Sequence, residues 1–192
     1  MQSIQTIFRR PIEEALAAVS KSEWSDIYVI SFYIDNEDDD PRRPLLVIGY
    51  NTESNYKASI SRASNEQEAC WNFTFWLQNE LLVFGRSGSE SATLVQSWIH
   101  DQGFGYTDEE EEEDFDRCME LGDEIITRFV EECCQLVSSL HKDGVISAIC
   151  GRSIPVLVHE LEYYHEIADQ NERANPPSVV HEFVGWIRQM YK

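Results

Sequence analysis

The hydrophobic positions near the start of the chain recur at steps of three and four residues, which is typical of an amphipathic helix. These positions are Ile4, Ile7, Phe8, Ile12, Leu16 and Val19. Pro11 interrupts the pattern. Because a proline ring is accepted in the first turn of a helix, the sequence predicts that the stronger helix runs from about residue 11 to 20.

Residues 27–34 are β-branched or aromatic at nearly every position, so no polar face alternates with an apolar one. Such a segment predicts a strand that is covered on both faces and lies inside its sheet. Residues 45–50 predict a second strand. The polar turn between them, residues 35–41, is too short for a parallel crossover, so we expect the two strands to be antiparallel.

The longest periodic segment follows an acidic block at residues 108–114. Its apolar residues keep a period of 3.6 and predict one long helix near residues 111–140. The acids precede this helix where the macrodipole favours negative charge, and His141 and Lys142 lie at its other end. Gly144 is expected to end it.

The remaining patterns predict further helices and a third strand. The helices are expected at residues 64–76, at 89–103 with Ser89 as the cap and Gly103 as the end, at 164–174, and after a cap at Ser178. Residues 145–149 and 154–159 are short apolar runs, of which the second is the better strand. The sequence therefore predicts an α+β fold, with a central, mainly antiparallel sheet packed by helices in a single domain over residues 1–192 and an acidic segment at 108–116.

Charge narrows the choice of partners. The chain of 192 residues has 35 acidic and 15 basic residues, a formal net charge of -20. Such a surface repels phosphate backbones and anionic membranes, so neither direct nucleic-acid binding nor membrane binding is expected. The charge favours basic proteins or cations as partners, although it also serves simply to keep a protein soluble.

Cysteine usage and the start of the chain predict a cytoplasmic protein. The cysteines are Cys70, Cys118, Cys133, Cys134 and Cys150. Their number is odd and no CxxC spacing occurs, so buried, reduced thiols are expected, with Cys118 and Cys133 facing a core. The first residues lack the apolar stretch of a signal peptide, and no run of about eighteen apolar residues predicts a membrane span.

Residues 159–165, His-Glu-Leu-Glu-Tyr-Tyr-His, resemble a zinc-protease motif, but a tyrosine stands where the second histidine is required. On a helix, Glu162 and His165 could share a metal ion, with His159 and His181 as further ligands. The interpretation that we favour is a set of solvent-facing polar residues at the edge of a strand.

The other candidate motifs do not predict catalysis. Cys133 and Cys134 follow two glutamates, which would raise a thiol pKa rather than activate a nucleophile. The glutamate run lacks the alternation and the glycine of a calcium-binding loop. The glycine-containing loops match no phosphate-binding fingerprint. No catalytic residue, metal site or cofactor is predicted.

Four fragments, taken in order, carry a resemblance. They are the strand at residues 27–35, Asn-Thr-Glu at 51–53, the strand at 154–160, and Ala-Asn-Pro-Pro at 174–177. Together they resemble a bacterial family of small cytosolic α+β proteins known only as a domain of unknown function, loosely similar to the immunity proteins of bacterial toxin systems. The fragments span nearly the whole chain, although each is short. The resemblance implies an α+β domain and no known catalytic residues.

The function predicted is that of a non-catalytic acidic binding protein, immunity- or inhibitor-like, which captures a basic protein such as a toxin or effector domain. The residues expected to bind the partner are Asp38, Asp39, Asp40, Glu109, Glu110, Glu111, Glu112, Glu113 and Asp114, with Tyr163 and Tyr164 as exposed aromatic anchors. Three alternatives stay open: a nucleic-acid mimic that blocks a DNA-binding enzyme, a metal-dependent enzyme using the His159–His165 region, and a plain structural or regulatory domain. The oligomeric state is not predicted.

Overall fold

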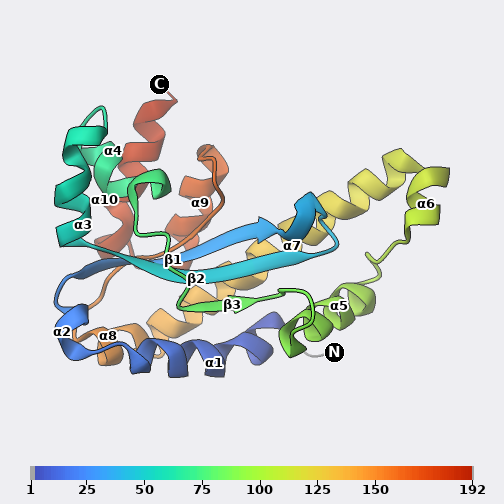
Figure 1. The fold of residues 1–192 in the computed structure, drawn as a ribbon, viewed down its shortest axis with the longest axis horizontal. Coiled ribbons are helices and arrows are strands. Elements are labelled where there is room, and N and C mark those ends of the chain that lie inside the picture. The colour runs from blue at the N-terminus through green and yellow to red at the C-terminus, as the bar shows by residue number, and fades with distance from the viewer. Residues whose placement is uncertain (1–2, 192) are drawn as a thin grey trace.

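A computed structural model describes residues 3–191 of the chain. Within these residues one four-stranded sheet is present, in the order β3-β2-β1-β4 (Figure 1). The strands are β1 (Ile27–Asn36), β2 (Pro44–Thr52), β3 (Leu82–Phe84) and β4 (Val156–His159). β2 is antiparallel to both β1 and β3, whereas β4 is parallel to β1. The predicted α+β class and mainly antiparallel sheet are confirmed.

β1 lies inside the sheet and is covered on both faces, as its sequence predicts. Ile30 and Phe32 are fully buried on one face. Val29 is fully buried on the other. Because both faces meet hydrophobic side chains, the strand needs no polar alternation.

The first face of the sheet is covered by four helices that contribute most of the larger hydrophobic core. They are α1 (Ile4–Ala18), α5 (Glu90–Gln102), α7 (Phe115–Lys142) and α8 (Val145–Cys150). Phe8 of α1 stacks on Phe84 of β3 with ring centroids 3.9 Å apart, and its ring edge meets Phe129 of α7. This layer fixes α7 across the sheet.

The second face is covered by a smaller aromatic core. Its helices are α3 (Glu53–Ser59), α4 (Glu66–Trp71), α9 (His165–Ala174) and α10 (Pro177–Met190). Trp71 of α4 and Phe183 of α10 meet edge to face at 5.8 Å. The short helices α2 (Lys21–Trp24) and α6 (Asp108–Glu113), and the single turns η1 (Glu37–Asp39), η2 (Ile60–Arg62) and η3 (Phe73–Phe75), lie in the connections.

The first helix begins earlier than predicted, because Pro11 lies within it. Ser3 caps the helix by accepting a hydrogen bond from the Thr6 amide. A proline inside a helix costs about 3 kcal/mol. Ile4 and Phe8 are both fully buried, and each such side chain contributes roughly 1.5–3 kcal/mol. Burial of the turns before Pro11 therefore offsets the lost hydrogen bond.

The acidic block forms its own helix, α6, and is not the first part of the long helix. Thr107 and Glu110 form a capping box at the start of α6. Asp114 then leaves the helical conformation, at φ -145° and ψ 75°, and caps α7 by accepting from the Arg117 amide. Like charges one turn apart repel, and an aspartate side chain competes for backbone donors, so the break falls within the acidic run.

Three other boundaries differ from the prediction. Residues 145–150 form the helix α8 between Gly144 and Gly151, both left-handed, since a short apolar run fits either structure. The expected helix at 64–76 stops at Trp71, where the Asn72 side chain accepts a hydrogen bond from the Thr74 amide. α10 begins at Pro177 and not after Ser178. The backbone N–H at the first position of a helix has no acceptor within the helix, so a proline there loses no hydrogen bond.

The outer edge of β4 is closed by side chains of α9 and its C-cap. Asn171 accepts a hydrogen bond from the Val158 amide at 2.8 Å and donates one to the Val158 carbonyl at 2.7 Å. Asn175 makes the same pair of bonds with Val156, at 2.8 and 2.9 Å. The two amides thus take the place of a neighbouring strand and hold α9 along the sheet edge.

No helix formed by residues 3–191 combines the length and the apolar character needed to cross a membrane.

Replacing Asn171 by alanine should lower the free energy of unfolding by about 2–4 kcal/mol, because the buried Val158 amide loses its acceptor. Chemical denaturation measures this change. Glu172→Ala, which removes an exposed ion-pair partner on the same helix, is the control and should cost less than about 1 kcal/mol. Equal effects of the two substitutions would contradict the role of Asn171 at the edge.

Candidate binding site

Arg42 joins the two acidic segments that the sequence singles out. Its guanidinium donates to Asp40 at 2.9 Å and to Asp108 of α6 at 2.6 Å. Its charged carbon also lies 4.9 Å from the centre of the Tyr106 ring. Burial raises the pKa of the Asp40 carboxyl, but the hydrogen bonds and charge of Arg42 outweigh it and the pKa is lowered. The β1–β2 turn and α6 therefore lie at the same end of the molecule (Figure 1).

The acids of the turn differ in how much charge they leave free. Asp38 is paired with Arg43 at 2.9 Å, and Arg43 also pairs with Glu37 at 2.7 Å. Asp38 and Asp39 both have φ of 58°, a left-handed conformation that aspartate tolerates better than most residues. Asp39 is exposed and forms no ion pair with any described residue. Asp39 thus carries the free charge of the turn.

Within α6, some carboxylates serve the structure and others only face solvent. Glu110 closes the capping box, and a carboxylate oxygen of Glu111 lies 3.9 Å from the Arg42 guanidinium. Glu109, Glu112 and Glu113 are exposed and have no ion-pair partner among residues 3–191. These three carboxylates are free to meet a partner.

Two large apolar side chains are exposed directly after these acids. Phe115 and Met119 are 59% and 52% exposed and lie one helical turn apart at the start of α7. The periodic pattern places them on the core face, but here α7 projects beyond the sheet (Figure 1). We call α6, this first turn of α7 and Asp39 the acidic end.

The prediction that Tyr163 is an exposed anchor is wrong. Its side chain is 9% exposed, and its hydroxyl accepts a hydrogen bond from the Phe73 amide at 3.2 Å. The ring packs edge to face on Phe183 and Trp186 in the second core. Tyr164 is half-buried and donates to the Glu160 carboxylate at 2.8 Å.

His159 is fully buried, so it is not one of a set of solvent-facing residues. Its Nδ1 lies 3.0 Å from the Glu160 carbonyl oxygen, to which it donates, and its Nε2 accepts from the Ser31 hydroxyl at 2.8 Å. The ring is surrounded by aromatic side chains, those of Tyr33, Phe73, Trp76 and Tyr163. Burial lowers the pKa of His159 to about 4, which keeps the ring neutral.

The proposed metal ligands do not come together. Glu162 precedes α9, which begins at His165, so the two residues do not share a helix face. His181 lies on α10, beside a separate hollow with Cys70 and Trp71. Across residues 3–191 no three His, Cys, Asp or Glu side chains are grouped so that they could hold a metal ion.

The cysteines of α7 are buried, as the sequence predicts. Cys118 and Cys133 face the core. Burial raises the pKa of Cys133 well above its ordinary value, and that of Cys134 to about 12. Neither thiol has the depressed pKa that a nucleophile requires.

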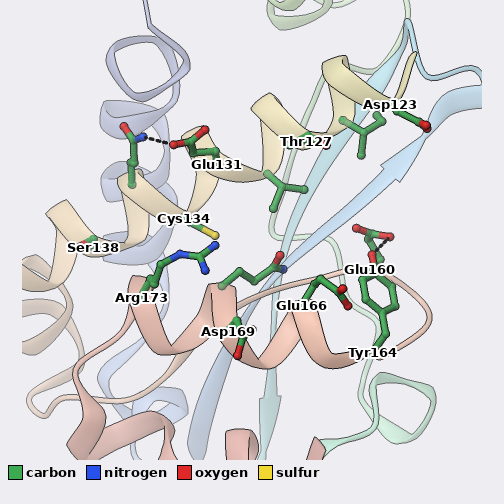
Figure 2. A pocket seen from close by; sticks show the side chains of 14 residues that line it. Asp123, Thr127, Glu131, Cys134, Ser138, Glu160, Tyr164, Glu166, Asp169 and Arg173 are labelled. Atoms are coloured by element: carbon green, nitrogen blue, oxygen red, sulfur yellow. Dashed lines mark hydrogen bonds between the residues drawn. The ribbon is translucent and has the colours of Figure 1, made fainter. Parts of the chain in front are cut away.

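A groove of about 1050 Å³ lies between α7 and α9 (Figure 2). Its α7 wall runs from Asp123 to Ser138, and its other wall from Glu160 to Arg173. Sequence reasoning missed this groove, since its two helices are apart in the chain. The signal that was available is the acidic face of the helix at 164–174.

No family model, curated protein or solved structure matches this chain. The resemblance to a family of immunity-like proteins therefore stays a prediction.

The buried neutral His159 predicts a loss of stability in mild acid. Its pKa is about 4 when folded, against about 6.5 when unfolded, so the stability is fully present above pH 6.5 and lost as the pH falls toward 4. Between pH 7.5 and 4.5 the contribution is about 2 kcal/mol. Chemical denaturation at both pH values should show a smaller loss for His159→Gln than for the wild type. His181→Gln, at an exposed position of α10, is the control, and it should keep the wild-type difference.

Proposed function

We propose that this protein is a non-catalytic acidic binding protein that captures a basic protein, in the manner of an immunity protein or inhibitor. The partner is a toxin or effector domain with a basic surface, and it docks on the acidic end. The chain has a net charge of -20, which would accelerate the encounter with such a partner.

The observation that carries this proposal is the pair of exposed apolar side chains beside unpaired carboxylates. Phe115 and Met119 are only about half buried by their own fold, so burying the rest of each side chain against a partner would contribute roughly 1 kcal/mol each. Glu109, Glu112 and Glu113 supply charge within the same end of the molecule. Charge sets the association rate and orientation, whereas the apolar side chains supply affinity.

The nucleic-acid mimic is the alternative that shares the acidic surface. A mimic needs carboxylates along an elongated face and has no use for exposed phenylalanine and methionine side chains. The described acids of α6 are gathered at one end, together with Phe115. Competition between this protein and duplex DNA for the same partner would favour the mimic.

The test begins with the protein immobilised and its binding partners identified at low and at raised salt. The purified partner is then used to measure association and dissociation rates. Replacing Glu109, Glu112 and Glu113 by glutamine should slow association at low salt by about ten-fold, with the difference shrinking as salt is raised. Replacing Phe115 and Met119 by serine should mainly accelerate dissociation, by about ten-fold or more.

A matched control removes three negative charges elsewhere. It replaces exposed glutamates of α1, α4 and α10 by glutamine, namely Glu14, Glu66 and Glu182. This variant should associate within about two-fold of the wild type, because its charges lie away from the docking surface. An α6 variant that associates as fast as the wild type would overturn the proposal.

A further inference from the structure

The groove between α7 and α9 is separate from the acidic end. α9 is held along β4 by Asn171, and α7 crosses the first face of the sheet, so the groove is built by fixed elements. Apolar side chains of α7, Ile126 and Val130, contribute to its lining. It is therefore a preformed hollow of the size that binds extended ligands.

One end of the groove carries uncompensated negative charge. Asp123, Glu160 and Glu166 line it and form no ion pair with any described residue. Figure 2 shows Glu160 and Glu166 at this end and Arg173 beside Cys134 at the other. Unpaired carboxylates thus gather at one end of the groove, whereas Glu131 and Asp169, which also line it, are paired with Arg128 and Arg188.

A side-chain hydrogen-bond acceptor opens on the same groove. Gln170 is 7% exposed, and its Nε2 donates to the Val158 carbonyl at 2.8 Å, which fixes the orientation of the amide. Its Oε1 has no hydrogen-bond partner among residues 3–191, although Gln170 lines the groove. This oxygen is accessible to solvent, so it is available to accept a hydrogen bond from a ligand in the groove.

The length and the neutral groups of the groove select an extended peptide. The wall from Asp123 to Ser138 contains sixteen residues of helix and is about 22 Å long, which matches six or seven extended residues. The hydroxyls of Thr127 and Ser138 and the Gln170 oxygen also line it, and they are suited to the amides of a peptide backbone. A simple polycation would use only the carboxylates.

We infer that the groove binds an extended segment of the partner protein, with arginine or lysine side chains at Asp123, Glu160 and Glu166 and a backbone amide at Gln170. This inference rests on the proposed function for the identity of the partner, but the site is independent of the acidic end. The groove would add a second contact, specific for a short basic sequence.

Titration calorimetry tests the groove with a hexapeptide in which arginine alternates with alanine and both termini are blocked. We expect the wild type to bind it with Kd on the order of 100 μM or tighter. A variant with Asp123→Asn, Glu160→Gln and Glu166→Gln should bind about ten-fold more weakly, since three exposed ion pairs of about 0.5 kcal/mol each are lost. The control variant at Glu14, Glu66 and Glu182 should stay within about two-fold.

A steric test separates the groove from general charge. Thr127→Trp fills the groove without changing charge and should abolish peptide binding, whereas Thr93→Trp, at an exposed threonine of α5, should not. Circular dichroism and thermal unfolding show whether each variant is folded. Asn171→Ala is not a suitable variant for this test, because it would loosen α9, which forms one wall of the groove.

The outcomes that overturn the inference are distinct from failure of the proposed function. A wild-type Kd weaker than about 1 mM, or equal binding by Thr127→Trp, would show that the groove does not bind such a segment. Spermine binding as tightly as the peptide would show a polycation site without peptide recognition. If the α6 variant still loses the partner in these cases, the proposed function stands without the groove. If only the groove variants lose the partner, the assignment of the acidic end as the docking surface is wrong.

Discussion

Two asparagine side chains close the outer edge of β4, and the placement of the second helical layer depends on them. Backbone groups two residues apart on a strand repeat at about 6.7 Å, while residues four apart on a helix repeat at about 6 Å. Asn171 and Asn175 match these two repeats, so each amide faces the amide and carbonyl of one strand residue. Asn175 also accepts from the Nε2 of His141, at 3.0 Å, which ties the end of α7 to the same edge. An edge that would otherwise be open for pairing with another chain thereby becomes the anchor of α9, and the groove follows from that anchoring.

The acidic residues divide into those that stabilise the fold and those that are free to act outside it. Asp40 and Asp108 pair with Arg42, and Glu110 caps α6. The Arg42–Asp40 pair is partly buried, and through its second ion pair with Asp108 the same guanidinium links α6 to the β1–β2 turn. The carboxylates without partners then gather beside exposed apolar side chains. A surface that combines both is better suited to protein capture than to remaining in solvent, since about half of each apolar side chain is left exposed by the isolated chain.

The second face of the sheet shows the opposite use of polar groups. Ser31 and His159 lie diagonally across neighbouring parallel strands, two residues apart in register, and burial among aromatic rings keeps the histidine neutral. A serine hydroxyl that donates to an imidazole is the arrangement of a nucleophile with its base, but both side chains here are closed off from solvent. Their hydrogen bond satisfies two buried polar groups.

The sequence by itself determined those helices and strands that are marked by neighbouring residues, such as an apolar run, a short turn or a capping residue. Continuous apolar runs indicated β1 and β4, the short turn after β1 required an antiparallel partner, and Ser89 and Gly103 marked the ends of α5, as the structure confirms. The hydrophobic period and the composition could not predict the positions at which tertiary packing overrides the structure that the local sequence favours. Pro11 lies inside a helix because the turns before it are buried, and residues 145–150 are helical because two left-handed glycines enclose them. Nor could the sequence show that Tyr163 is buried, that Phe115 is exposed, or that α7 and α9 enclose a groove. Exposure and cavities depend on which elements pack together over long sequence separations, and that is decided only when the whole sheet and its two layers have assembled.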